Sequence, residues 1–235
     1  MTDILSSYKR EVEGDQPPLH YPDYKSTVKR NPARALLPLD HTLSEVTGPV
    51  FRERLAGPDR ADLTTQHKGQ PIGERISIEG WVLDEDGRPV PNTLIEIWQC
   101  NSSGRYLHPV DQHDAPLDPN FSGAGQIVTN AEGGYRFVTI KPGEYPWRNT
   151  PNAWRAAHIH FSLFGPAFAT RLICQLYFPG DPLLEWDPMF QCIPTQAGKD
   201  RVTAKYDPTL SKAEWSLGYR FNFVLRGRDS TPWEA

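Results

Sequence analysis

The sequence predicts an all-β protein with an antiparallel β-sandwich core, and three observations carry that prediction. The chain has 235 residues, a length at which β-sandwiches commonly form one domain. It contains 23 prolines, about twice the usual share of roughly 5%, and each proline removes a backbone donor that a long helix needs. From residue 71 onward, short alternating apolar segments recur at near-regular spacing with turn residues between them, as in sandwiches.

The strands are expected in order along residues 71–235, with long loops and short helices between them. Residues 75–100 hold two alternating segments around a hairpin-like Asp-Glu-Asp-Gly-Arg-Pro turn, and residues 126–140 repeat this form around Asn-Ala-Glu-Gly-Gly. One helix is expected near Thr209–Leu217, because Pro208 is a helix-start signal. Further strands are expected at 156–164, 170–178 and 220–227.

Residues 1–70 predict an extended N-terminal arm with one or two short helical turns, because they have weak periodicity and many breakers. An arm of this length lies either on its own core or on a partner subunit, and we predict subunit contacts. Disorder is the alternative interpretation. Apolar anchors argue against it, and they are Leu36, Leu37, Leu39, Val50, Phe51 and Leu55.

Composition excludes several classes of protein. Lys and Arg total 25 against 29 Asp and Glu, so the net charge of −4 does not fit a nucleic-acid binder. No stretch approaches the roughly 20 apolar residues of a membrane span, and the first residues have no apolar core of a secretory signal. Three cysteines without a CxxC pair predict buried thiols in a reducing compartment. We therefore expect a cytoplasmic protein that binds neither nucleic acid nor membrane.

His158-Ile159-His160 is the sharpest local pattern, and it lies in a predicted strand. Residues two apart on a strand project to the same side, so both imidazoles would face one point and could act as two neighbouring metal ligands. A pair of hydrogen-bonded histidines on a sheet face is the alternative. The following residues 161–164 offer no carboxylate, although a distant acid could still complete a ferrous site with two histidines and one carboxylate.

Two tyrosines stand in unusual surroundings. Tyr106 lies in the loop after the strand that ends at Trp98, and Tyr145 is held between Pro142-Gly143 and Pro146. Ordinary aromatic packing is the alternative for each. A neutral phenol, with a pKa of about 10, is a poor ligand, but a hard trivalent cation stabilises phenolate and reverses this.

Together these segments resemble the signature of the intradiol ring-cleavage dioxygenases. The first runs from Ile78-x-Gly80 to Gly104-x-Tyr106, and the second from Tyr145-Pro146 to His160-Phe161. The resemblance covers residues 71–235, which it marks as the catalytic domain. It implies an aromatic diol and O2 as substrates and a non-haem Fe(III) cofactor. The implied metal ligands are Tyr106, Tyr145, His158 and His160.

The same resemblance implies roles for further residues. Tyr145 would leave the metal and act as a base, and Arg155 would stabilise negative charge on the substrate ring. Gln175 would hydrogen-bond near the oxygen site, with a solvent-facing polar residue as the alternative. The remaining implied substrate contacts are Trp98 and Trp147, as cavity walls, and Tyr24, as a partner of a substrate carboxylate.

Four further segments look closest to the protocatechuate-cleaving branch of that family, in which this type of chain pairs with a homologous α subunit as a hetero-oligomer. They are residues 22–25, 98–101, 145–149 and 176–183. Catechol-specific members carry a helical N-terminal dimerisation region, and this chain has no such pattern. The alternatives are a catechol or hydroxyquinol dioxygenase, a non-catalytic α subunit, and a passive transthyretin-like sandwich module.

Overall fold

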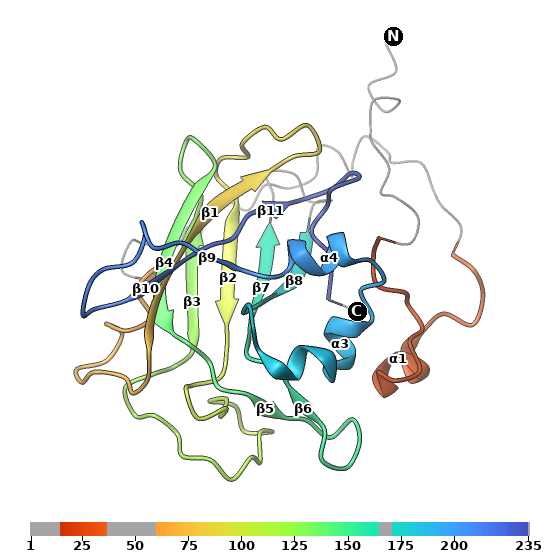
Figure 1. The fold of residues 1–235 in the computed structure, drawn as a ribbon, viewed down its shortest axis with the longest axis horizontal. Coiled ribbons are helices and arrows are strands. Elements are labelled where there is room, and N and C mark those ends of the chain that lie inside the picture. Colours follow the sequence, from red (N-terminus) through yellow and green to blue (C-terminus); the bar gives the residue numbers. More distant parts are fainter. Residues whose placement is uncertain (1–14, 37–59, 165–170, 235) are drawn as a thin grey trace.

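The computed structural model describes residues 15–36, 60–164 and 171–234. Two β-sheets form the body of the molecule, and short helices lie beside one of them (Figure 1). The all-β prediction is confirmed. The helices within the described residues are α1 (Lys25–Arg30), η3 (Pro182–Glu185), α3 (Pro188–Gln191) and α4 (Gln196–Arg201), and none of them is long and apolar enough to cross a membrane.

The strands divide between a five-stranded sheet, a four-stranded sheet and a two-stranded ribbon. The five-stranded sheet contains β1 (Arg75–Leu83), β4 (Gly134–Ile140), β9 (Lys205–Tyr206), β10 (Leu217–Arg220) and β11 (Phe223–Val224). The four-stranded sheet contains β2 (Leu94–Trp98), β3 (Ala124–Val128), β7 (His158–Phe164) and β8 (Arg171–Tyr177). The ribbon is formed by β5 (Tyr145–Pro146) and β6 (Trp154–Arg155).

The two expected hairpin-like units instead carry the chain from one sheet to the other. β1 pairs antiparallel with β4, whereas β2 pairs antiparallel with β3 and β7. The hairpin interpretation is therefore wrong, because strands whose apolar faces meet across a core must lie in opposite sheets. The turn tips still form as their residue types indicate. Asp84 accepts hydrogen bonds from two backbone N–H groups of its own turn, and Asn130 does the same in the second turn.

The C-terminal part of the sandwich differs from expectation in two ways. β10 and β11 both pair parallel with β1, and the expected strand at 220–227 is divided between them. Residues 209–216 form turns and a short bridge, and Leu217 begins β10, so the expected helix is wrong. The carboxylate of Asp207 accepts hydrogen bonds from the backbone N–H and hydroxyl of Thr209, and Glu214 has a φ of 58°. These local hydrogen bonds compete with a helix for the same backbone.

The core between the sheets determines which way β7 presents its side chains. Ile159, Phe161 and Leu163 are fully buried, and Phe161 packs edge-to-face on Phe223 with ring centroids 5.0 Å apart. Because side chains alternate along a strand, His158 and His160 project from the opposite face. That face is where the loops after β2 and β4 gather.

The described part of the N-terminal arm, residues 15–36, lies on the chain's own body. Asp15 forms an ion pair with Arg201 at 2.7 Å, and the backbone N–H of Lys25 donates to Oδ1 of Asn149. Its single helix, α1, fits the expected short helical turn. The division at residue 70 and the subunit contacts stay predictions. Five of the expected anchors lie outside the described residues: Leu37, Leu39, Val50, Phe51 and Leu55.

Candidate metal centre

The hydrogen-bond register of the four-stranded sheet aligns the strand-borne side chains of the site. His160 lies opposite Trp98 on β2 and opposite Gln175 on β8, and His158 lies opposite Tyr177. The two imidazole rings have centroids 4.8 Å apart. The sheet thus brings together the two histidines that period-two alternation placed on one face.

Tyr106 reaches both histidines from the loop that follows β2. Its hydroxyl oxygen lies 3.2 Å from Nε2 of His158 and 3.2 Å from Nε2 of His160. Gly104, two residues earlier, has a φ of 76°, and a Cβ atom there would collide with the carbonyl oxygen of Glu144. Only glycine combines that conformation with so close an approach, so the Gly-x-Tyr pattern lets this loop pack against residues 144–145.

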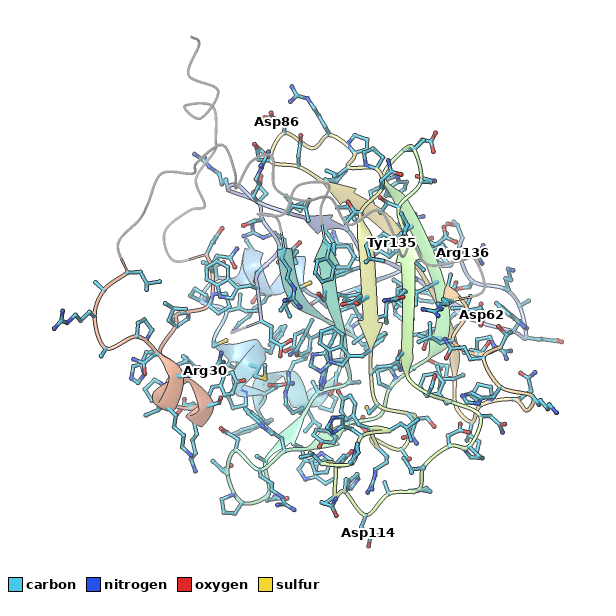
Figure 2. All side chains as sticks on the ribbon, turned by 180° about the vertical axis from the view of Figure 1, so that it is seen from behind. Arg30, Asp62, Asp86, Asp114, Tyr135 and Arg136 are labelled. Atoms are coloured by element: carbon cyan, nitrogen blue, oxygen red, sulfur yellow. The ribbon has the colours of Figure 1, made fainter. Side chains whose placement is uncertain are left out.

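Tyr145, the fourth expected ligand, packs against Tyr106. Its ring meets the ring of Tyr106 edge-to-face, with centroids 5.0 Å apart, and the short β5–β6 ribbon pairs its backbone with Arg155. Tyr145 also lines a cavity of about 790 Å³, whose rim includes Asp114 at the outer end of the loop after β2 (Figure 2). Tyr145 therefore lies between Tyr106 and the cavity.

Both imidazoles turn Nε2 toward Tyr106. Nδ1 of His158 lies 2.6 Å from the carbonyl oxygen of Ala156, and Nδ1 of His160 lies 3.1 Å from Oε2 of Glu234. Burial acts to raise the pKa of Glu234, but the contact with His160, helped by Gln175 and Arg155, lowers the pKa below its usual value. A carbonyl and an ionised carboxylate only accept hydrogen bonds, so each Nδ1 carries a proton, and a neutral ring then presents the Nε2 lone pair toward Tyr106.

Burial determines the protonation of the other donors. It lowers the pKa of His158 well below its usual value, and the positive charge of Arg155 adds to the effect, so this imidazole is neutral. Burial also raises the pKa of Tyr106 well above 10, and burial together with the Asp111 carboxylate raises that of Tyr145. The free site thus holds neutral phenols, which a bound cation would convert to phenolates.

Two phenols and two imidazoles fit a hard trivalent cation. Within the described residues, no three His, Cys, Asp or Glu side chains cluster closely enough to hold a metal ion. Glu234 contacts the Nδ1 side of His160, away from Tyr106. The described residues therefore provide no carboxylate that could complete a ferrous site with His158 and His160. Tyr106, whose hydroxyl reaches both histidines, and Tyr145, which packs against Tyr106, are phenols that would become anionic donors on losing a proton.

Arg155 is the centre of a buried polar cluster next to His158. Its Nε donates to the Asp187 carboxylate at 3.0 and 3.1 Å, and its Nη1 lies 3.3 Å from Nε2 of His158. Its Nη2 donates to Oε1 of Gln175 at 2.6 Å and to the hydroxyl of Tyr177 at 2.9 Å. The residue is 4% exposed, so its pairing with Asp187 is not a surface ion pair. The guanidinium is thus held rigidly on several sides.

Gln175 keeps one donor free beside this cluster. Its Oε1 accepts from Arg155 and Tyr177, and the residue is 4% exposed, so the solvent-facing alternative is wrong. Its Nε2 forms no hydrogen bond of normal geometry among the described residues, although the Gln175 side chain lies near Glu234 and helps to lower the pKa of that carboxyl. A buried donor left unpaired costs about 1–3 kcal/mol, so this atom suits a place where a ligand oxygen supplies the acceptor.

The three expected aromatic contacts lie in two places. Tyr24 is 8% exposed and meets Trp147 edge-to-face at 5.1 Å, and Trp147 lines the cavity beside Tyr145. Trp98 instead stacks on His160, with centroids 4.9 Å apart and planes 7° from parallel. Trp98 lines a different hollow from the cavity beside Tyr145. Its position therefore suits a residue that supports His160 better than one that forms a wall of the cavity beside Tyr145.

Three residues of the site were not expected from the sequence. Tyr177 lies two residues after Gln175 on a strand, so period-two alternation could have placed it on the same face. The Asp187-Pro188 pair marks a helix start, and Asp187 does cap α3, but nothing local indicates its bond to Arg155. Glu234 comes from the C-terminal end, and no local pattern indicates that it contacts a histidine.

Comparisons with known proteins identify the class of this chain. Residues 46–227 match the family described as "Dioxygenase". The dioxygenase domain of a carbohydrate-binding fusion protein from Streptomyces sp. SirexAA-E shares the fold, with 26% identity, a TM-score of 0.52 and coverage of 77% of this chain and 94% of that one. An intradiol ring-cleavage dioxygenase from Tetranychus urticae shares the fold at 21% identity and a TM-score of 0.52, covering 77% and 93%. The chain belongs to the intradiol ring-cleavage dioxygenase family, whose enzymes use non-haem iron.

Within that family, one kind of subunit is closely similar. Residues 8–42 match the "Protocatechuate 3,4-dioxygenase beta subunit N terminal" family. The chain is 56% identical over 216 residues to the protocatechuate 3,4-dioxygenase beta chain of Burkholderia cepacia, covering 91% of this chain and 92% of that one. A hydroxyquinol 1,2-dioxygenase from Corynebacterium glutamicum is 33% identical over 201 residues, covering 78% and 63%. The resemblance stated from the motifs is confirmed, and the catalytic interpretation is supported over the passive module.

Proposed function

We propose that this chain cleaves the ring of protocatechuate (3,4-dihydroxybenzoate) with O2 between its two hydroxyl-bearing carbons, giving 3-carboxy-cis,cis-muconate. The cofactor is a non-haem ferric ion held by Tyr106, Tyr145, His158 and His160. One observation carries the proposal: the Tyr106 hydroxyl lies 3.2 Å from the Nε2 lone pairs of both histidines. The 56% identity to a protocatechuate 3,4-dioxygenase beta chain supports the choice of substrate.

The surroundings of the four proposed ligands give them different roles. When bound, the ferric ion supplies Lewis acidity and a template for the diol. His158 and His160 bind as neutral imidazoles, and two phenolates offset most of the metal's charge, which limits the desolvation penalty of a buried centre. Tyr145 is half-buried and lines the cavity, so it is the phenolate that can take a proton from an incoming diol hydroxyl, as a general base.

The surrounding residues hold the ring and its developing charge. The Arg155 guanidinium, fixed by Asp187, stabilises negative charge on the substrate, and the free Nε2 of Gln175 donates to an oxygen of the reacting group. Trp147 provides a flat wall for an aromatic ring. Tyr24 packs on Trp147 and Lys25 lines the same cavity, so this end suits the carboxylate that distinguishes protocatechuate from catechol.

We further propose a homologous α subunit as the partner in a hetero-oligomer. The relative from Burkholderia cepacia is named as a beta chain. Val110 and Trp154 line the cavity beside Tyr145 and are 78% and 38% exposed, and the neighbouring Leu107 is 61% exposed. Exposed apolar side chains gathered around a cavity mouth fit a surface that another chain covers.

The function is tested by oxygen uptake and product spectra with three diols. We expect a burgundy protein, from charge transfer between tyrosinate and iron, that consumes O2 fastest with protocatechuate and yields the ultraviolet spectrum of 3-carboxy-cis,cis-muconate. Faster turnover of catechol or hydroxyquinol would move the substrate assignment to those classes. A protein that stays colourless after ferric reconstitution and consumes no O2 with any of the three would contradict the proposal.

Replacing Tyr106 with phenylalanine is expected to remove one ionisable ligand. Because its pKa lies well above 10 in the metal-free protein, Tyr106 must release its proton when it binds the cation. Ferric loading at pH 8, followed with an indicator dye, should therefore release one proton fewer from Y106F than from wild type, and the visible band should shift and weaken. Tyr206→Phe, at an exposed tyrosine, is the matched control. Equal proton release and an unchanged band in Y106F would refute the assignment.

A further inference from the structure

Residues 230–234 pack against the body of the protein. After β11 the chain runs back against the molecule, and its C-terminal end lies beside α3 and α4 in the view of Figure 1. Ser230 and Thr231 are 3% and 2% exposed. The backbone N–H of Trp233 donates to the side chain of Gln16 at 3.0 Å, and that of Glu234 donates to the carbonyl of Ile173 on β8 at 2.8 Å. The tail is therefore held by backbone hydrogen bonds that do not involve the Glu234 carboxylate.

That carboxylate has a separate contact. Oε2 of Glu234 lies 3.1 Å from Nδ1 of His160, and the two side chains are only 23% and 12% exposed. The equivalent atom of His158 bonds instead to a main-chain carbonyl, that of Ala156. One candidate metal ligand is thus oriented by its own strand, whereas the other is oriented by a side chain 74 residues away.

Two contacts together determine the position of the His160 ring. Trp98 stacks on it with planes 7° apart, which fixes the plane of the imidazole. Stacking alone does not decide which nitrogen carries the proton or which edge faces Tyr106. In a neutral imidazole, an anionic acceptor at Nδ1 decides both, because the proton must then lie on Nδ1 and the lone pair on Nε2.

We propose that Glu234 is a positioning residue of the metal centre, which holds His160 in the Nδ1-protonated tautomer and raises the basicity of its Nε2. The inference rests on the proposed function, and it assigns to the C-terminal tail a part in the centre as well as in the fold. Carboxylates bonded to metal-bound histidines act in this way in other proteins, and their loss typically weakens metal affinity or activity by about 10–100-fold.

The experiment compares three variants with wild type, each prepared with any partner chain that copurifies. Glu234→Ala removes the acceptor, Glu234→Gln keeps an acceptor oxygen without the charge, and Glu132→Gln is a matched control at an exposed turn residue away from the site. Iron loss to a chelator is followed at the visible band. The tautomer of His160 is read in the metal-free protein from its ring ¹⁵N shifts, a signal that needs neither iron nor turnover.

We expect E234A to lose iron about 10–100-fold faster than wild type, E234Q to lie between the two, and E132Q to match wild type. The metal-free E234A protein should also lose the pure Nδ1-protonated signal of His160. If E234A unfolds at a lower temperature than wild type, the comparison rests on E234Q, which keeps the shape of the side chain. Its iron loss and His160 tautomer then test the role of the carboxylate. Wild-type iron retention and an unchanged tautomer in both variants would overturn the inference while leaving the proposed function intact. Wild-type protein that binds no iron would instead contradict the function.

Discussion

Replacing Arg155 with alanine is expected to lower the free energy of unfolding by about 3–5 kcal/mol and to abolish ring cleavage. The loss in stability follows because Asp187 is fully buried and would lose its cationic partner. For a chain of this size, that change corresponds to a fall in Tm of roughly 6–20 °C. Thermal and denaturant unfolding measure the stability, and oxygen uptake measures the activity.

Two further variants separate the effect of the buried Asp187 charge on stability from the effect of Arg155 on ring cleavage. Arg155→Ala combined with Asp187→Asn should recover part of the lost stability, because the buried carboxylate is gone, but none of the activity. Arg88→Ala removes an ion pair whose arginine side chain is 73% exposed, so it should change stability by less than about 1 kcal/mol. If R155A and R88A lowered the free energy of unfolding by the same small amount, the buried Arg155–Asp187 pair would not contribute the expected stability.

Replacing His160 with alanine is expected to reduce oxygen uptake with protocatechuate by at least about 100-fold. Loss of a residue that only supports a metal ligand typically costs about 10–100-fold, and loss of a ligand itself should exceed that range. The variant also leaves Glu234 without its His160 contact. Iron content per chain and the visible band should fall together with the activity.

His67→Ala is the matched control for this prediction, because His67 is exposed and lies outside the candidate centre. Its iron content and oxygen uptake should equal those of wild type. Normal turnover by the H160A protein would exclude His160 as a ligand, and with it the proposed four-residue centre.

Local pattern was enough to predict much of the sandwich and part of the site. Strand alternation placed His158 and His160 on one face, and the structure has their rings 4.8 Å apart. The Gly104-x-Tyr106 spacing depends on a glycine, because positive φ is combined there with a close approach of the Glu144 carbonyl that leaves no room for a Cβ atom. Where local pattern failed, as at residues 209–217, side-chain hydrogen bonds to the backbone outweighed helix propensity.

The sequence by itself determined which side chains share a strand face, because the pleat of a β-strand depends only on neighbouring residues. Only the tertiary structure decided which faces meet. It separates β1 from β2 into different sheets, and it brings Asp187 to Arg155 and Glu234 to His160 across 32 and 74 residues. These contacts form only when the sheets and loops pack together, so their stability comes from interactions between distant segments. No short segment of the sequence therefore predicts them.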